Sequence, residues 1–109
     1  DNETFSITKN DIVYLPKGSK YLTVGDETTP YHVIVVSFQL NDNSEFPHLP
    51  LNTITRVDNS TFYANLFHQM ENTWFYKGVA YKLKCNSILL EILFHLIKHS
   101  VEQNLHTHN

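Results

Sequence analysis

The chain has 109 residues and a formal net charge of −3, and it is 41% hydrophobic and 13% aromatic. These values are typical of one small globular domain and argue against a disordered segment. The acidic balance and the single arginine, Arg56, argue against a surface that binds a phosphate backbone, which needs clustered basic residues. A lone cysteine excludes an internal disulfide, and the sequence has no apolar run long enough to span a bilayer. Together these features predict a cytoplasmic protein without a membrane partner.

The first forty residues predict strands at 4–8, 11–15, 20–24 and 32–40, and residues 53–57 predict a fifth strand or an extended strap. The runs are rich in β-branched and aromatic residues, and turn-forming residues separate them. Short connections favour antiparallel pairing, because a parallel pair needs a long crossover. Both alternating sets of side chains in 32–40 are largely apolar, so we expect that strand to be central or covered on two sides.

A rigid corner follows the second strand, because Pro16 cannot donate to a ladder and Gly18 can adopt the positive φ of a tight turn. The second motif of the cupin barrel reads Gly, five residues, Pro-x-Gly, two residues, His, three residues, Asn. Asn10 stands at its first Gly, Tyr21 at its His and Gly25 at its Asn. The segment therefore resembles a cupin in which the residue at the metal-ligand position is a tyrosine, a poor ligand at neutral pH.

This substituted form, NDIVYLPKGSKY followed by a strand ending in VSFQL, resembles the N-terminal sensing domain of AraC-type transcriptional regulators. The resemblance covers residue 5 to about residue 104. It implies that Asp11 and Pro16-x-Gly18 serve the fold, that the barrel interior binds a small-molecule effector such as a sugar, and that the helices after the barrel form a homodimer. The barrel strands that normally precede Asn10 are mostly missing, so we expect an N-terminally truncated fragment. DNA would be bound only by a helix-turn-helix domain absent from this chain.

After a polar loop at 41–50, the apolar period changes from that of a strand to that of a helix. Asp58, Asn59 or Ser60 can cap the first helix, because their side chains accept free amides of its first turn. Gly78 is expected to end it. The apolar residues at helical spacing are Phe62, Tyr63, Leu66, Phe67, Met70 and Trp74.

A second helix is predicted at about 80–103, and its apolar stripe is wider than one contact needs. Ile88, Leu90 and Phe94 broaden that stripe. A helix of this kind packs on two partners, here the preceding helix and a second copy of the protein. The stripe residues, which are the candidate dimer interface, are Leu89, Ile92, Leu93, Leu96, Ile97 and Val101.

Four residues on or beside the predicted strands are candidates for effector binding: Tyr14, Tyr21, Tyr31 and His32. Facing inward, they would add polar groups to an apolar cavity, which is the usual makeup of a small-molecule site. The alternative is that these aromatic residues only fill the small barrel or cover its rim.

Metal binding and nucleophilic catalysis are less well supported. His95 and His99 are four residues apart on the predicted second helix, a spacing that zinc sites use, but no third ligand lies nearby in the sequence. Surface or interface histidines are the favoured reading, and His106 and His108 read as part of a polar terminal segment. Cys85 is read as a small buried hydrophobe, because nothing orients a base toward it.

The sequence therefore predicts one α+β domain over 1–109, with a partial cupin-like antiparallel β-barrel of about four to five strands in 1–58. A two-helix antiparallel hairpin in 59–109 would form the dimer. The predicted function is effector sensing and dimerisation, with no catalytic residue, metal or cofactor. Two alternatives stay open: a metal-dependent cupin enzyme of the isomerase or dioxygenase type, for which only His32 is an available strand ligand, and a stand-alone cupin-like binding module.

Overall fold

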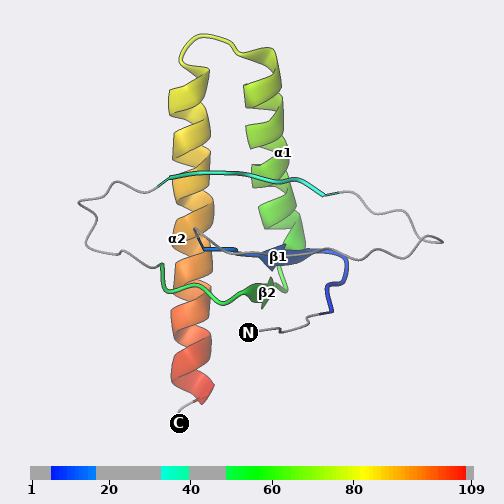
Figure 1. The fold of residues 1–109 in the computed structure, drawn as a ribbon, viewed down its shortest axis with the longest axis vertical. Helices are drawn as coiled ribbons and strands as arrows, with labels where there is room; N and C mark the ends of the chain where they lie inside the picture. Colours follow the sequence, from blue (N-terminus) through cyan, green and yellow to red (C-terminus); the bar gives the residue numbers. More distant parts are fainter. Residues whose placement is uncertain (1–5, 17–32, 40–48, 108–109) are drawn as a thin grey trace, which may run out of the picture.

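The computed structural model describes residues 6–16, 33–39 and 49–107. Two short strands, β1 (Asp11–Val13) and β2 (Ile54–Arg56), precede two helices, α1 (Ser60–Tyr76) and α2 (Tyr81–Thr107). Figure 1 shows the helices side by side as a hairpin, with β1, β2 and the extended segment 33–39 crossing one face of it. The described part of the chain is therefore a helical layer covered on one side by extended segments.

The core lies between the two helices, where the apolar residues of each helix recur every three to four positions and share a face. Ile12, Val36, Leu51 and Val57 of the extended layer pack against this core, which confirms that the two layers are in contact. The buried residues of the core are Tyr63 and Met70 on α1 and Cys85, Ile88, Ile92 and Leu96 on α2.

The start of α1 agrees with the prediction, but its caps differ in detail. Asn59 occupies the N-cap position, yet its side chain makes no capping hydrogen bond. At the other end, Lys77 adopts the left-handed conformation (φ 50°), and its N–H donates to the carbonyl oxygen of Thr73 at 3.1 Å. The left-handed residue that ends α1 is thus Lys77 rather than Gly78, which was expected to play that part.

The second helix begins one residue later than predicted and ends four residues beyond the predicted end. Ala80 precedes it with a φ of 58°, and its carbonyl accepts a hydrogen bond from the N–H of Lys84 at 3.0 Å, so Ala80 is the N-cap. Alanine offers no side-chain acceptor there, and a left-handed conformation is costly for it. In the described ranges, neither α2 nor α1 contains a stretch long and apolar enough to cross a membrane.

The predicted cupin-like barrel of four to five strands is wrong. In the described ranges the only strands are β1 and β2, three residues each, which pair antiparallel in one small sheet. The predicted strand at 11–15 is shortened to β1 and that at 53–57 to β2. Residues 6–8 of the predicted first strand are not in a strand, and the predicted strand at 20–24 lies outside the described residues.

The segment 33–39 explains part of this difference. Its even-numbered residues are half-buried and its odd-numbered residues are exposed, so the predicted alternation is present. It nevertheless belongs to no sheet in the described part of the chain, and Val35 is 76% exposed, so the predicted coverage on two sides is wrong. Val36 packs against the core of the helical hairpin, and this contact replaces a neighbouring strand as the cover for its inner side.

Candidate functional site

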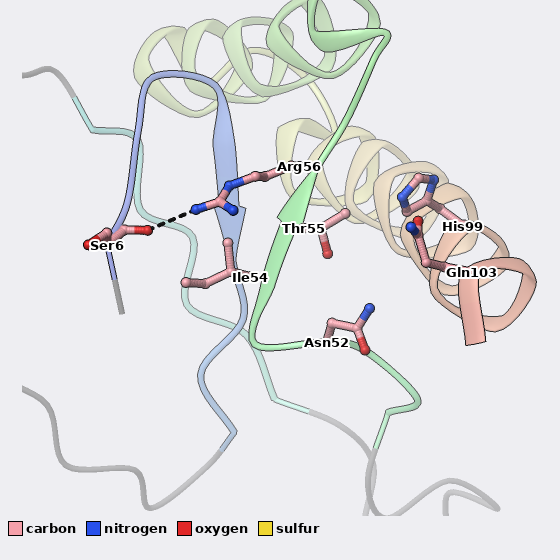
Figure 2. A pocket seen from close by; sticks show the side chains of 7 residues that line it. All are labelled: Ser6, Asn52, Ile54, Thr55, Arg56, His99 and Gln103. Carbon is pink, nitrogen blue, oxygen red and sulfur yellow. Dashed lines mark hydrogen bonds between the residues drawn. The ribbon is translucent and has the colours of Figure 1, made fainter. Parts of the chain in front are cut away.

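A polar cleft of about 460 Å³ lies between β2 and the C-terminal half of α2. Figure 2 shows His99 and Gln103 projecting from α2, with Thr55 of β2 and Asn52 from the preceding segment nearby. Its volume is within the range of about 300–1,000 Å³ usual for small-molecule sites. The residues that line it are Ser6, Asn52, Ile54, Thr55, Arg56, His99 and Gln103.

All three residues of β2 line the cleft, and the pairing with β1 fixes their register. Alternate residues of a strand point to opposite sides, and Thr55 is only 5% exposed while its neighbour Arg56 is exposed. The partners across the sheet are Asp11 with Arg56, Ile12 with Thr55 and Val13 with Ile54.

The positive charge of Arg56 at the edge of the cleft is compensated. Its Nε lies 3.4 Å from the carboxylate of Asp11, and its Nη2 donates to the carbonyl oxygen of Ser6 at 3.1 Å. The backbone N–H of Thr8 donates to the same carboxylate at 2.9 Å, and this bond, together with the Thr8 hydroxyl and Arg56, lowers the pKa of Asp11 below its usual value. Asp11 and Arg56 therefore form a charge pair that links β1 to β2 across the sheet.

The cleft suits a small, neutral, hydrogen-bonding ligand. Amides of Asn52 and Gln103, the hydroxyl of Thr55 and the imidazole of His99 provide both donors and acceptors. No carboxylate is among the lining residues, so nothing there favours a cation, and the guanidinium of Arg56 is already paired. Hydroxyl and carbonyl groups of a ligand fit this set of partners best.

The structure gives no support to a metal site or a catalytic nucleophile in the described residues. They contain no group of three or more His, Cys, Asp or Glu side chains that could hold a metal ion. His95 and His99 do not act as a pair: His95 contacts Glu91 at 3.0 Å, whereas His99 lines the cleft. Cys85 is buried in the core, and its Sγ lies 3.7 Å from the carbonyl oxygen of Met70, which fits a structural role.

Of the four residues predicted to bind an effector, the structure describes one. Tyr14 is half-buried at the end of β1, where its N–H donates to the carbonyl oxygen of Thr53 at 2.8 Å, and it does not line the cleft. Tyr21, Tyr31 and His32 lie outside the described residues. The prediction for those three stays a prediction.

The cleft residues were mostly missed at the sequence level. His99 was predicted to be a surface or interface histidine, with metal binding as the alternative, and the polar residues on and before β2 carry no motif. The pairing of β2 with β1 and its position over α2 create the cleft, and neither is encoded by local spacing. The one available signal was the opposite charge of Asp11 and Arg56, which could have suggested the sheet register.

The outer face of α2 is the second candidate, as an interaction surface. Measured at 100° per residue, six apolar side chains lie within about 80° of arc, opposite the side that carries Ile92 and Leu96. Along the chain these residues are separated by 7, 4, 3, 4 and 4 positions. A coiled-coil seam alternates steps of three and four within each heptad, so only the last step departs from that pattern. We call them the outer seam, and they are Leu83, Leu90, Phe94, Ile97, Val101 and Leu105.

The outer seam extends along about 33 Å of helix, taking 1.5 Å per residue, and five of its six residues are exposed while Ile97 is half-buried. Leu83 is 71% exposed, Leu90 66%, Phe94 60% and Leu105 61%. Exposed apolar residues are common singly, but a regular row of them on one helix marks an interaction surface.

The predicted dimer residues fall on both sides of α2. Ile92 and Leu96 are buried in the chain's own core, and Leu89 packs against it. Leu93 is half-buried, and Ile97 and Val101 belong to the outer seam, where Val101 is 43% exposed. Their role in a dimer is a prediction that the single chain does not test.

Comparison of the chain with protein-family models, with curated proteins and with solved structures gives no match.

Proposed function

We propose that this chain is a dimerisation and effector-sensing element of an AraC-type regulator, acting in the cytoplasm, with DNA bound by another part of the protein. The sequence resemblance described above suggests the class of regulator. The observation that carries the proposal is the outer seam of α2. Its coiled-coil spacing and its exposure favour a second copy of the same helix as the partner.

A two-fold contact between two copies of α2 would be self-complementary, because each seam presents the same row of side chains to the other. Burying an exposed leucine or phenylalanine contributes about 1.5–3 kcal/mol at most. Several such side chains per copy can therefore offset the loss of rotational and translational freedom on association.

The test is the mass of the whole chain in solution, measured by analytical ultracentrifugation over a range of concentrations. We expect a dimer for the unchanged chain and a monomer for the double variant Leu90→Glu/Phe94→Glu, because charges on the seam would be desolvated in the contact. Val79→Glu is the matched control, since Val79 is fully exposed in the turn between the helices and lies off the seam.

Two results would overturn the dimer. One is a monomeric unchanged chain at all concentrations, and the other is a double variant that still dimerises with its helix content intact by circular dichroism. A loss of the dimer in Val79→Glu would place the contact at the turn instead of the seam.

The sensing part of the proposal is supported by the cleft between β2 and α2, whose polar groups suit a neutral ligand such as a sugar. Binding there would contact α2 directly through His99 and Gln103, on the helix that carries the seam. A ligand can change DNA affinity only if it prefers one arrangement of the dimer. In the intact regulator, DNA affinities that are equal with and without a saturating effector would contradict sensing.

A further inference from the structure

Although the sequence alone predicts no membrane partner, we infer that the turn joining α1 to α2 is a docking site for an anionic membrane surface. This inference is independent of the proposed function, because it concerns the opposite end of the hairpin from the cleft. We call the site the hairpin tip: the apolar residues Trp74, Phe75, Tyr76 and Val79, and the cations Lys77, Lys82 and Lys84. In Figure 1 the turn forms one end of the long axis, away from β1 and β2.

The apolar residues of the hairpin tip are unusually open to solvent. Val79 is 102% exposed, Tyr76 78%, Phe75 77% and Trp74 53%. Trp74 contacts Tyr81 and Phe75 contacts Tyr76 edge-on, yet all four side chains stay mostly open to solvent, so this end of the hairpin is rich in exposed apolar groups. Tryptophan and tyrosine are the side chains that favour the boundary between lipid headgroups and acyl chains.

The charge of the hairpin tip is complementary to anionic lipid. Residues 72–90 contain three lysines and no acidic residue, although the whole chain has 11 acidic residues and a net charge of −3. Lys82 and Lys84 are exposed on the first turn of α2. Lys84, with Tyr76 and Val79, also lines an open hollow of about 320 Å³, which places a cation beside a space that fits a phosphate headgroup.

Two features argue against other occupants. A second copy placed tip to tip would bring six ammonium groups together, which is unfavourable. Stacked nucleic-acid bases would need open ring faces, but the ammonium of Lys77 lies 4.2 Å from the centre of the Trp74 ring and 4.9 Å from that of Tyr81. Phe75 and Val79 offer no hydrogen bond to a base, whereas both can enter the acyl region of a bilayer.

The experiment uses the whole chain and two kinds of vesicle, pure phosphatidylcholine and a mixture with phosphatidylglycerol. Trp74 is the only tryptophan, so its fluorescence reports on the hairpin tip alone. We expect a blue shift and protection from an aqueous quencher with the mixed vesicles. Each lysine near an anionic surface raises the affinity about fivefold. At low salt, three lysines should therefore bind the mixed vesicles up to about 100-fold more tightly than the neutral vesicles.

Variants separate the hairpin tip from general charge. Lys82→Gln/Lys84→Gln should weaken binding by about 25-fold on the same scale. Lys9→Gln/Lys98→Gln removes two exposed cations elsewhere, and it should bind like the unchanged chain. Phe75→Ser/Val79→Ser should keep weak, salt-sensitive binding but lose the blue shift of Trp74.

Three results would overturn the inference: no change of Trp74 emission with either vesicle, equal binding to both vesicles, or equal loss of binding in both lysine pairs. Trp74 quenching by a single-stranded oligonucleotide, without any response to vesicles, would assign the hairpin tip to nucleic acid and would also overturn it.

Discussion

Ser100 on α2 offers a direct test of what a buried hydroxyl without a hydrogen-bond partner costs this fold. The residue is 1% exposed, and its Oγ has no hydrogen-bond partner in the described part of the chain. A buried hydroxyl without a partner costs about 1–3 kcal/mol by mutational data. Replacing Ser100 with alanine removes that cost and also improves helix propensity by about 0.5 kcal/mol. We therefore expect Ser100→Ala to raise the free energy of unfolding by about 2 kcal/mol.

Ser87→Ala is the matched control on the same helix. Ser87 is exposed, and its hydroxyl donates to the carbonyl oxygen of Lys84 at 2.7 Å, a bond that competes with water and adds little. This control should gain only the propensity term of about 0.5 kcal/mol. The difference of roughly 1.5 kcal/mol corresponds to about 6–12 °C in Tm for a domain of this size.

The assay is urea unfolding followed by far-UV circular dichroism, with Tm measured in parallel. Both variants keep the helix, so their slopes with urea should match that of the unchanged chain, and only the midpoints should differ. A Ser100→Ala variant that is no more stable than Ser87→Ala would refute the reasoning. It would mean that the hydroxyl of Ser100 has a hydrogen-bond partner after all.

Two further predictions concern the turn and the charge pair. Ala80→Gly should raise the free energy of unfolding by about 1 kcal/mol, because glycine tolerates the positive φ and is the better N-cap. Thermal melts check this, and a Tm below that of the unchanged chain would contradict it. As its control, Gly78→Ala should be neutral or slightly stabilising, since a Cβ there meets nothing within 4 Å. The pKa of Asp11 is lower in the folded chain than its value near 3.8 in the unfolded chain. The stability that the ionised Asp11 contributes is therefore complete above pH 3.8, and it is lost as the pH falls through the lower pKa of the folded chain. Asp11→Asn should therefore be less stable than the unchanged chain at neutral pH, and it should lose less stability on acidification. Urea titrations from about pH 6 to about 2 measure this loss, and an equal loss in both proteins would count against the pairing.

The helices could be predicted from the sequence because their signal is local. Apolar residues three and four apart identify α1 and α2, and polar residues before Ser60 locate the start of α1 within one position. The detail at the turn could not be predicted in the same way. Lys77 and Ala80 adopt positive φ values although Gly78, the residue that tolerates them best, lies between them.

The sheet and the cleft could not be predicted because they depend on pairing between distant segments. The run at 32–40 has the composition and the alternation of a buried strand, but these features do not say whether a strand or a helix covers it. Here the covering partner of Val36 is the helical hairpin. Similarly, the resemblance at Pro16 and Gly18 specifies a turn but not the number of strands around it.

The two kinds of connection in this fold also imply an order of folding. α1 and α2 are joined by residues 77–80, whereas β1 and β2 are separated by residues 14–53, a segment about ten times longer. Closing the longer segment costs about 2 kcal/mol more in chain entropy. The helical hairpin is therefore expected to form first, and the strand layer to dock on it later. In reverse, partial unfolding would release the strands while the hairpin persists. The part of the hairpin core that Ile12, Val36, Leu51 and Val57 contact would then be exposed in addition to the outer seam, which makes that species prone to aggregate.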